Sequence, residues 1–417
     1  MAEKRCAFCK RPTNEVKKLI GGPDGPFICD RCTDAAGETL AADQKSSAKA
    51  EEKPLLKPRE IKAFLDEHVI SQEKAKQDVA VAVYNHYKRR EAIRKGMKFD
   101  CEIKKSNILL LGPSGTGKTE LARTVSKLLG VPFYNADATK MTQAGYVGDD
   151  VESMLQGLLQ DASGDVERAE WGVIFLDEVD KLARKSGRGA SGYRDVTGEG
   201  VQQALLKMVE GTKVRTPRGG RMATGQEVDV VDTENVLFIC AGSFAGIEEV
   251  VQKRVNKDVR LGFGSAARKD VSEKETYLAI EEEDILEFGI IPELLGRLPV
   301  HTTTLPLTEE EMVRILTEPK SAIVKQFKAL FQMDGIDLQF DEAALKAIGK
   351  EAQKRPTGAR ALRSIMEKIL RPYSYDYPSE DEITAVRITE DVVTGKGEAV
   401  VVREGRKKEP KPTAMQG

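Results

Sequence analysis

The eight residues GPSGTGKT, at 112–119, have the types and spacing of a phosphate-binding loop. The apolar run SNILLL precedes them and the helical pattern KTELARTVSKLLG follows, so a strand leads into the loop and a helix leaves it. Glycines let backbone N–H groups curve around phosphate oxygens at the helix N-terminus, where the dipole favours anions. Lys118 is expected to reach the β- and γ-phosphates, and the Thr119 hydroxyl to ligate Mg²⁺. The predicted nucleotide-binding residues of this segment are Gly112, Pro113, Ser114, Gly115, Thr116, Gly117, Lys118, Thr119 and Glu120.

Two acidic residues end a second apolar run, VIFLDE. Asp177 suits the coordination of the magnesium ion, and Glu178 suits the polarisation of an attacking water. An ordinary exposed acidic strand end is the alternative interpretation. The phosphate-binding motif upstream favours the catalytic one, so we expect hydrolysis of a nucleoside triphosphate.

Four cysteines form two C-x-x-C pairs, Cys6 with Cys9 and Cys29 with Cys32, separated by nineteen residues. Two such pairs can supply four thiolates to one tetrahedral Zn²⁺, and a site filled by protein ligands has no open position for catalysis. The surrounding segment has too few large apolar residues to fold on a core alone, so a structural zinc ion is predicted. Its mild basic excess permits nucleic acid, but protein docking is at least as well supported. Cys101 and Cys240 are interpreted as packing residues.

The composition bounds the remaining possibilities. The chain has 417 residues, 40% hydrophobic and 32% charged, with a formal net charge of -2. This length predicts two or three domains, and the charge gives no general reason to expect nucleic acid. No apolar run approaches the roughly 18 residues of a membrane span, and the N-terminus lacks the apolar stretch of a signal peptide. A cytoplasmic protein with neither membrane nor nucleic-acid partners is expected.

The pattern along the chain predicts an α/β fold. Buried strands in SNILLLGP, WGVIFLDE and NVLFICAG alternate with helices, which is typical of a parallel sheet covered on both faces. The part after about residue 305 is mainly helical, with a strand-like AVRITEDVV. The expected domains are a zinc module (1–40), a flexible linker (41–60), a large ATPase domain (61–304), a small C-terminal domain (305–403) and a disordered tail (404–417).

Two arginines could complete a nucleotide site. Arg297 follows an apolar helix in LLGRLPV, and Arg360 opens a helix in RPTGARALRS. A guanidinium can stabilise charge on a γ-phosphate, although in isolation each arginine is more simply a surface ion-pair partner.

A glycine-flanked aromatic loop, AGYVGDD, precedes a helical stripe. The stripe is predicted to be capped by Asp149 or Asp150. Taken alone, Tyr146 in this loop could simply be tucked into the core.

These motifs together resemble one family. CAFC with CDRC, GPSGTGKT, AGYVGDDVE, VIFLDEVDK, RGASGYRDVTGEGVQQALLK, GRLPV and TGARALRS resemble bacterial ClpX proteins in order and spacing, over nearly the whole chain except the linker and tail. ClpX proteins are the AAA+ unfoldase subunits of the Clp protease. The resemblance implies an AAA+ fold with a treble-clef-like zinc module, and a homohexamer with ATP between subunits. Arg297 would act on a neighbouring subunit's nucleotide, Arg360 on its own, and Val69 and Ile70 would contact adenine.

The resemblance also implies protein unfolding. Tyr146, Val147, Arg194 and Arg221 would line the substrate pore, and Leu261, Gly262 and Phe263 would dock onto the ClpP peptidase. Unfolded or tagged proteins would be the substrates, and adaptor proteins would bind the zinc module. No peptidase site is evident in the chain. Two departures from the family stand out: Ser71 where glycine is usual, and Met222 with Ala223 beside Arg221, where basic or titratable groups are usual.

An AAA+ ATPase acting on nucleic acid, like a clamp loader or a helicase, is the alternative. The cysteines precede the ATPase domain rather than lying within it, and GYVGDD is not basic, so both features favour a protein substrate. A scaffold with an inactive nucleotide site is disfavoured because Lys118, Asp177, Glu178 and Arg297 are all present.

Overall fold

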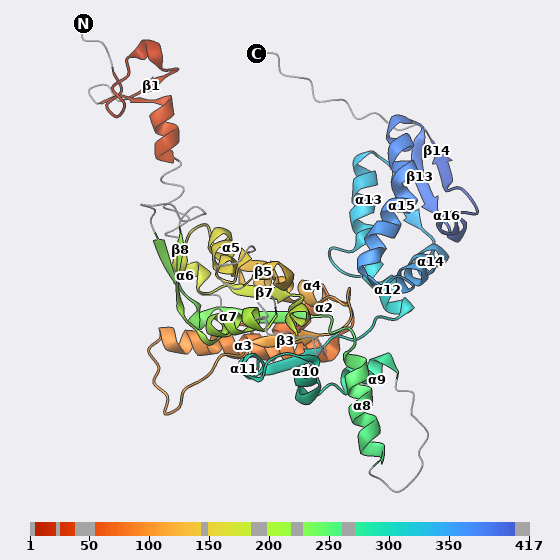
Figure 1. The fold of residues 1–417 in the computed structure, drawn as a ribbon. Helices are drawn as coiled ribbons and strands as arrows, with labels where there is room; N and C mark the ends of the chain where they lie inside the picture. Colours follow the sequence, from red (N-terminus) through yellow and green to blue (C-terminus); the bar gives the residue numbers. More distant parts are fainter. Residues whose placement is uncertain are drawn as a thin grey trace. The chain divides into compact units, whose positions relative to one another are not determined.

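The computed structural model describes residues 5–21, 26–37, 55–142, 149–184, 198–217, 228–260 and 272–404 (Figure 1). Contacts divide the chain into two compact units, Met1–Leu55 and Leu56–Gly417, and each is described by itself. In the described part of the chain, no helix is both long enough and apolar enough to cross a bilayer.

The first unit is built around a two-stranded antiparallel hairpin. Strand β1 (Leu19–Ile20) pairs with β2 (Ile28–Cys29), a short 3₁₀ helix η1 (Thr13–Glu15) precedes them, and residues 30–37 are helical. Strands of two residues bury almost no apolar surface, so this unit needs another source of stability.

The second unit contains the predicted parallel sheet. Its five strands run in the order β11-β3-β10-β7-β4, and every neighbouring pair is parallel. The strands are β3 (Ile108–Leu111), β4 (Phe133–Asp137), β7 (Val173–Asp177), β10 (Leu237–Gly242) and β11 (Val300–Thr303). Successive side chains of a strand point to opposite faces, and β3 and β10 are buried throughout. The prediction of a sheet with helices on both faces is confirmed.

Helices cover the two faces of this sheet. Helix α3 packs against β11 and β3, and α4 packs against β7 and β10. A continuous hydrophobic cluster joins alternate strand residues, such as Leu109, Ile174 and Phe238, to α5 and α7. The helices are α2 (Pro58–Asp66), α3 (Glu73–Arg94), α4 (Lys118–Leu129), α5 (Ser153–Asp161), α6 (Val166–Ala169), α7 (Glu199–Glu210), α8 (Ile247–Arg260), α9 (Glu273–Leu278), α10 (Glu282–Phe288) and α11 (Pro292–Leu295). Two small sheets, β5 (Met141–Thr142) with β6 (Asp149–Asp150) and β8 (Lys213–Pro217) with β9 (Val228–Asp232), and 3₁₀ helices η2 (Ala138–Lys140), η3 (Val179–Leu182) and η4 (Thr233–Asn235) complete this part.

The C-terminal part has its own core, drawn in blue in Figure 1. It is mainly helical as predicted, but its helices pack with a three-stranded sheet, β12-β13-β14. The elements are α12 (Glu309–Thr317), α13 (Ile323–Met333), β12 (Asp337–Phe340), α14 (Glu342–Gln353), α15 (Arg360–Asp376), η5 (Tyr377–Ser379), β13 (Ile383–Ile388), α16 (Glu390–Thr394) and β14 (Val400–Arg403).

Several local expectations are wrong. Asp149 and Asp150 do not cap a helix, because they form β6 and pair with β5, while α5 begins at Ser153. Cys101 is exposed rather than packed, since it lies in the irregular segment between α3 and β3, whereas Cys240 is buried as expected. The last residues assigned to the linker are helical from Pro58.

Candidate nucleotide and metal sites

The phosphate-binding loop connects β3 to α4, and crowding explains its glycines. Gly112, Gly115 and Gly117 have φ of 140°, 77° and 98°, in the region that favours glycine. A Cβ on Gly112 would also lie 2.2 Å from the carbonyl oxygen of Thr304. The loop therefore depends on glycine at these positions, because other residues adopt such backbone conformations only at a cost.

Lys118, the first residue of α4, points back into this loop. Its Nζ donates to the carbonyl oxygens of Gly112 at 2.6 Å and Pro113 at 2.8 Å. Burial lowers the pKa of Lys118 to about 8, and the nearby Asp177 carboxylate opposes that shift. A phosphate placed at the loop would offer this ammonium a stronger acceptor than a carbonyl.

The structure brings the two predicted magnesium ligands together. Thr119 Oγ1 donates to Asp177 Oδ2 at 3.4 Å, which joins the start of α4 to the end of β7. A hydroxyl and a carboxylate supply the oxygen ligands that Mg²⁺ takes beside phosphates. Glu178 follows with its side chain exposed and its backbone in the left-handed region, at φ 59° and ψ 31°.

Residues of the C-terminal part reach the same loop. Arg360 Nη1 donates to Ser114 Oγ at 3.4 Å, and Arg360 Nη2 lies 3.8 Å from Asp177 Oδ2. A Cβ on Gly115 would lie 2.4 Å from the carbonyl oxygen of Thr357, so backbone meets backbone there. The loop is thus contacted both by the part of the second unit that holds the parallel sheet and by the C-terminal part.

Val69 and Ile70 lie between α2 and α3 and are buried. Val69 Cγ1 would be 3.4 Å from a Cβ on Gly117, which places this valine beside the phosphate-binding loop. Ser71 and Gln72 follow in the left-handed region. The Gln72 side chain accepts from the N–H of Leu305 at 2.7 Å and donates to its carbonyl at 2.9 Å.

Arg297 is not brought to this loop. Its guanidinium pairs with Glu210 at 2.7 Å, and within the described ranges no hydrogen bond or ion pair joins that side chain to residues 112–119 or to Asp177. The predicted pore residues Tyr146, Val147, Arg194 and Arg221, and the docking residues Leu261, Gly262 and Phe263, lie outside the described residues.

Sequence reasoning missed Thr304, which follows the edge strand β11. Its Oγ1 lies 2.6 Å from Thr116 Oγ1, and its N–H donates to the carbonyl of Leu111 at 2.7 Å. No motif marks this threonine, because it meets the loop only through strand pairing.

The four N-terminal cysteines converge on one point. Their sulfur atoms all lie within 4.8 Å of one another, and those of Cys9 and Cys29 are 3.6 Å apart. Four thiolates about 2.3 Å from one zinc ion would be separated by about 3.8 Å. The backbone N–H of Cys9, above all, holds the pKa of Cys6 near 6, and the N–H of Cys29 donates to the Cys6 sulfur at 3.3 Å. The residues present therefore fit a tetrahedral zinc ion.

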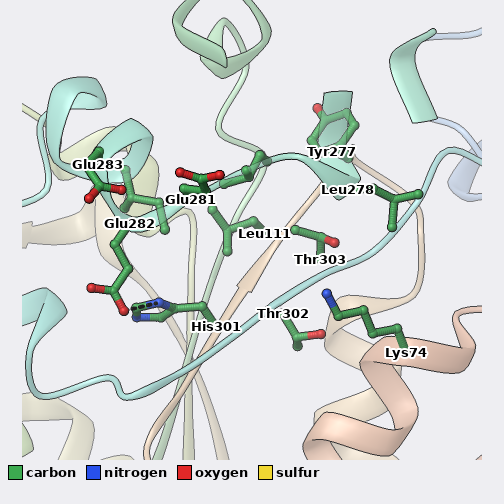
Figure 2. A pocket seen from close by; sticks show the side chains of 12 residues that line it. Lys74, Leu111, Tyr277, Leu278, Glu281, Glu282, Glu283, His301, Thr302 and Thr303 are labelled. Carbon is green, nitrogen blue, oxygen red and sulfur yellow. Dashed lines mark ion pairs between the residues drawn. The ribbon is translucent and has the colours of Figure 1, made fainter. Parts of the chain in front are cut away.

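A separate pocket of about 380 Å³ opens beside the ends of β3 and β11 (Figure 2). Glu281, Glu282, Glu283 and His301 line it with Lys74 across from them, and His301 Nδ1 lies 3.6 Å from Glu282 Oε1. None of residues 112–119 lines this pocket, so it is not the phosphate site.

Fold and site together define the class of protein: a P-loop ATPase of the AAA type with an N-terminal four-cysteine zinc finger. Three family models match: the ClpX C4-type zinc finger over residues 4–42, the AAA domain (Cdc48 subfamily) over 103–301, and the C-terminal, D2-small domain of ClpB protein over 307–390. The class accounts for both units of the chain.

Curated relatives identify the family within this class. The chain is 46% identical over 378 residues to the ATP-dependent Clp protease ATP-binding subunit ClpX of Treponema denticola, covering 90% of each chain. It is 43% identical over 406 residues to the protein of the same name from Borrelia duttonii, covering 96% of this chain and 93% of that one. The chain belongs to the ClpX family. The resemblance read from the motifs is confirmed, as are ATP, Mg²⁺ and Zn²⁺ as its cofactors.

Proposed function

We propose that this chain is an ATP-dependent protein unfoldase and translocase. It assembles as a homohexamer, threads unfolded or tagged proteins through a central pore, and delivers them to the ClpP peptidase. The names of the relatives support a role in a Clp protease, and any proteolysis would come from the partner.

The nucleotide chemistry is assigned to residues that lie around one loop. Lys118 would bind the β- and γ-phosphates, and Thr119 and Asp177 would hold Mg²⁺, which supplies charge neutralisation at the phosphates. Glu178 would orient and polarise the attacking water. Val69 and Ile70, buried beside Gly117, would contact adenine.

Arginines would sense the γ-phosphate from two sides. Arg360 already contacts Ser114 and lies near Asp177, which supports its action on the nucleotide of its own chain. Arg297 is about half exposed (47%) and pairs with Glu210, away from the loop. Its charge is therefore available to a neighbouring copy, and Glu210 would be the partner that it exchanges for phosphate.

One observation carries the proposal of mechanical work: the phosphate-binding loop touches the C-terminal part directly, through Thr357 and Arg360. A change at the γ-phosphate would therefore move one part of the second unit against the other. In this proposal Tyr146, Val147, Arg194 and Arg221 grip the polypeptide, and Leu261, Gly262 and Phe263 dock the peptidase. An aromatic side chain of this kind would bind the polypeptide through contact area, so it would not require a particular substrate sequence.

The test is ATP-dependent loss of fluorescence from a stably folded fluorescent protein with a short unstructured tail, in the presence of a trap that prevents refolding. We expect loss with the parent, and no loss with Tyr146→Ala although that variant still hydrolyses ATP. Glu178→Gln should abolish both hydrolysis and unfolding. Brisk hydrolysis without unfolding, combined with stimulation by nucleic acid, would overturn the proposal in favour of a nucleic-acid motor.

A further inference from the structure

The turn between α2 and α3, residues 67–72, carries both residues proposed to contact adenine. Val69 and Ile70 are buried in this turn, and Val69 lies beside the phosphate-binding loop. The next two residues, Ser71 and Gln72, have φ of 56° and 60°, which is left-handed backbone in residues other than glycine. Such conformations are unfavourable and persist only where the surrounding structure fixes them. The contacts of these two side chains therefore determine the shape of the turn.

Gln72 fixes the turn to the start of a hinge. Its buried side chain accepts from the N–H of Leu305 at 2.7 Å and donates to the carbonyl of the same residue at 2.9 Å. Leu305 packs against the core of the parallel-sheet part, whereas Leu307 belongs to the core of the C-terminal part. The chain therefore passes from one core to the other between these two leucines, and we call residues 305–308 the hinge.

Ser71 bonds to the far side of this hinge. Glu311 lies in the first turn of α12, where burial raises its pKa, but hydrogen bonds from the Ser71 hydroxyl and from Thr308 outweigh burial and hold that pKa below its usual range. The N–H of Thr308 donates to Glu311 Oε2 at 2.8 Å, which helps to orient the carboxylate. A glycine at position 71 would adopt the left-handed backbone readily, but it would have no hydroxyl to donate. We call the contact between these two side chains the Ser71–Glu311 latch.

The other end of the turn also contacts the C-terminal part. The carbonyl of Glu67 accepts from the N–H of Lys320 at 3.2 Å, and their side chains form an ion pair at 2.6 Å. Both of these side chains are exposed, so the ion pair contributes little, whereas Ser71 and Glu311 are half-buried. Of the two side-chain contacts between the turn and the C-terminal part, the latch is therefore the stronger.

We propose that the Ser71–Glu311 latch controls the rate of nucleotide exchange, because it holds the adenine-binding turn to the C-terminal part across the hinge. This inference rests on the proposed binding of adenine by Val69 and Ile70. The C-terminal part also meets the phosphate-binding loop through Arg360, so movement about the hinge would uncover the nucleotide and break the latch. Neither residue of the latch is proposed to contact the nucleotide. The latch should therefore slow entry and exit alike and leave the affinity unchanged.

The test is a stopped-flow measurement of the binding and release of a fluorescent ADP analogue by the full chain, with thermal unfolding measured alongside. Ser71→Ala removes the hydroxyl, and Ser71→Gly removes it and also relieves the left-handed backbone. We expect the association and dissociation rate constants both to rise by about fivefold in each variant, the effect of one lost hydrogen bond. The dissociation constant should stay within about twofold of that of the parent. Glu311→Gln weakens the same bond, so the double variant should be no faster than Ser71→Ala alone.

Thr302→Val is the matched control. It removes a hydroxyl that donates to Asp78 Oδ2 at 2.7 Å, a bond of the same kind that joins β11 to α3 and does not cross the hinge, so both rate constants should equal those of the parent. If both Ser71 variants match Thr302→Val, the latch does not control exchange. The same conclusion follows if dissociation alone accelerates and affinity falls, or if the effects of Ser71→Ala and Glu311→Gln simply multiply in the double variant.

Val69→Ala tests the assignment on which the inference rests. It should weaken the affinity for the analogue, because it removes part of the proposed contact with adenine. If this variant binds the analogue as tightly as the parent does, the proposed adenine contacts fail, and the inference fails with them for a different, identifiable reason.

Discussion

At the scale of single residues, Lys118 combines burial with charge. Its ammonium is held by loop carbonyls rather than by a carboxylate, so burial dominates and the pKa falls to about 8. A phosphate bound beside it would raise that pKa again, because an anion favours the charged form.

Nucleotide affinity should therefore decrease as the pH rises through the alkaline range. Below pH 8 the lysine is charged in both the folded and the unfolded chain. Between about 8 and the ordinary value near 10.5 the folded chain gives up a proton that the unfolded chain keeps, so the cost of burying the charge declines as pH rises. ATP needs the charged form, and its affinity should weaken above pH 8, approaching about tenfold per pH unit.

The measurement is the dissociation constant of a fluorescent ATP analogue from pH 7 to 9.5. Lys118→Met is the control: it should bind weakly at every pH, without the lysine-dependent slope. An affinity of the parent that is constant across this range would contradict the prediction.

Motifs predicted the residues that act through local spacing. The loop from Gly112 to Thr119 and the four cysteines were found from sequence because each set is contained in one or two short segments. Thr304 was not, because strand pairing alone brings it to the loop. Ser71 was noticed only as a departure from the family resemblance, and the structure shows that its backbone is left-handed, a conformation that favours glycine.

At the scale of elements, glycines in the left-handed region differ in what surrounds them. Gly112 lies against the Thr304 backbone, whereas Gly130, the C-cap of α4 with φ 66°, has no atom near the place where a Cβ would be. Substituting alanine at Gly130 would therefore test the cost of the backbone conformation alone, and substituting it at Gly112 would add the cost of a steric clash.

Gly130→Ala should lower the free energy of unfolding by about 1 kcal/mol, the cost of a left-handed alanine. Gly112→Ala adds overpacking against backbone and should cost about 3 kcal/mol, with loss of ATP binding. Urea unfolding followed by the fluorescence of Trp171, the single tryptophan, measures both. Equal effects of the two substitutions would refute the steric argument.

Helices and strands were predicted well where an apolar pattern within one short segment marks them. The helix beginning at Lys118 ends before Gly130 as expected, and the apolar runs form β3, β7 and β10. The start of α5 was misplaced, because Asp149 and Asp150 resemble helix caps in sequence but pair with Met141 and Thr142 instead. Pairing of this kind depends on residues outside the local window.

At the scale of the whole molecule, the two compact units obtain their stability differently. The second unit buries extensive apolar clusters, while the first has two-residue strands and a cluster of four thiols. Metal binding should therefore be coupled to folding in the first unit only.

Removing zinc with a strong chelator, or substituting Cys29→Ser, should unfold residues 5–37 and leave the basal ATPase rate nearly unchanged. Limited proteolysis and a colorimetric zinc assay report the first effect, and phosphate release reports the second. A proportional loss of zinc and of hydrolysis would show that the two units are not independent.

The contact between the phosphate-binding loop and the C-terminal part has a mechanical consequence. Each side contributes a glycine that faces backbone of the other side: a Cβ on Gly115 would lie 2.4 Å from Thr357 O, and a Cβ on Gly358 would lie 2.8 Å from Ser114 O. Two backbones in direct contact have little compressibility, since no flexible side chain lies between them to absorb a displacement. This joint should behave as a stiff one, so that a small shift of the loop is passed undiminished to the start of α15.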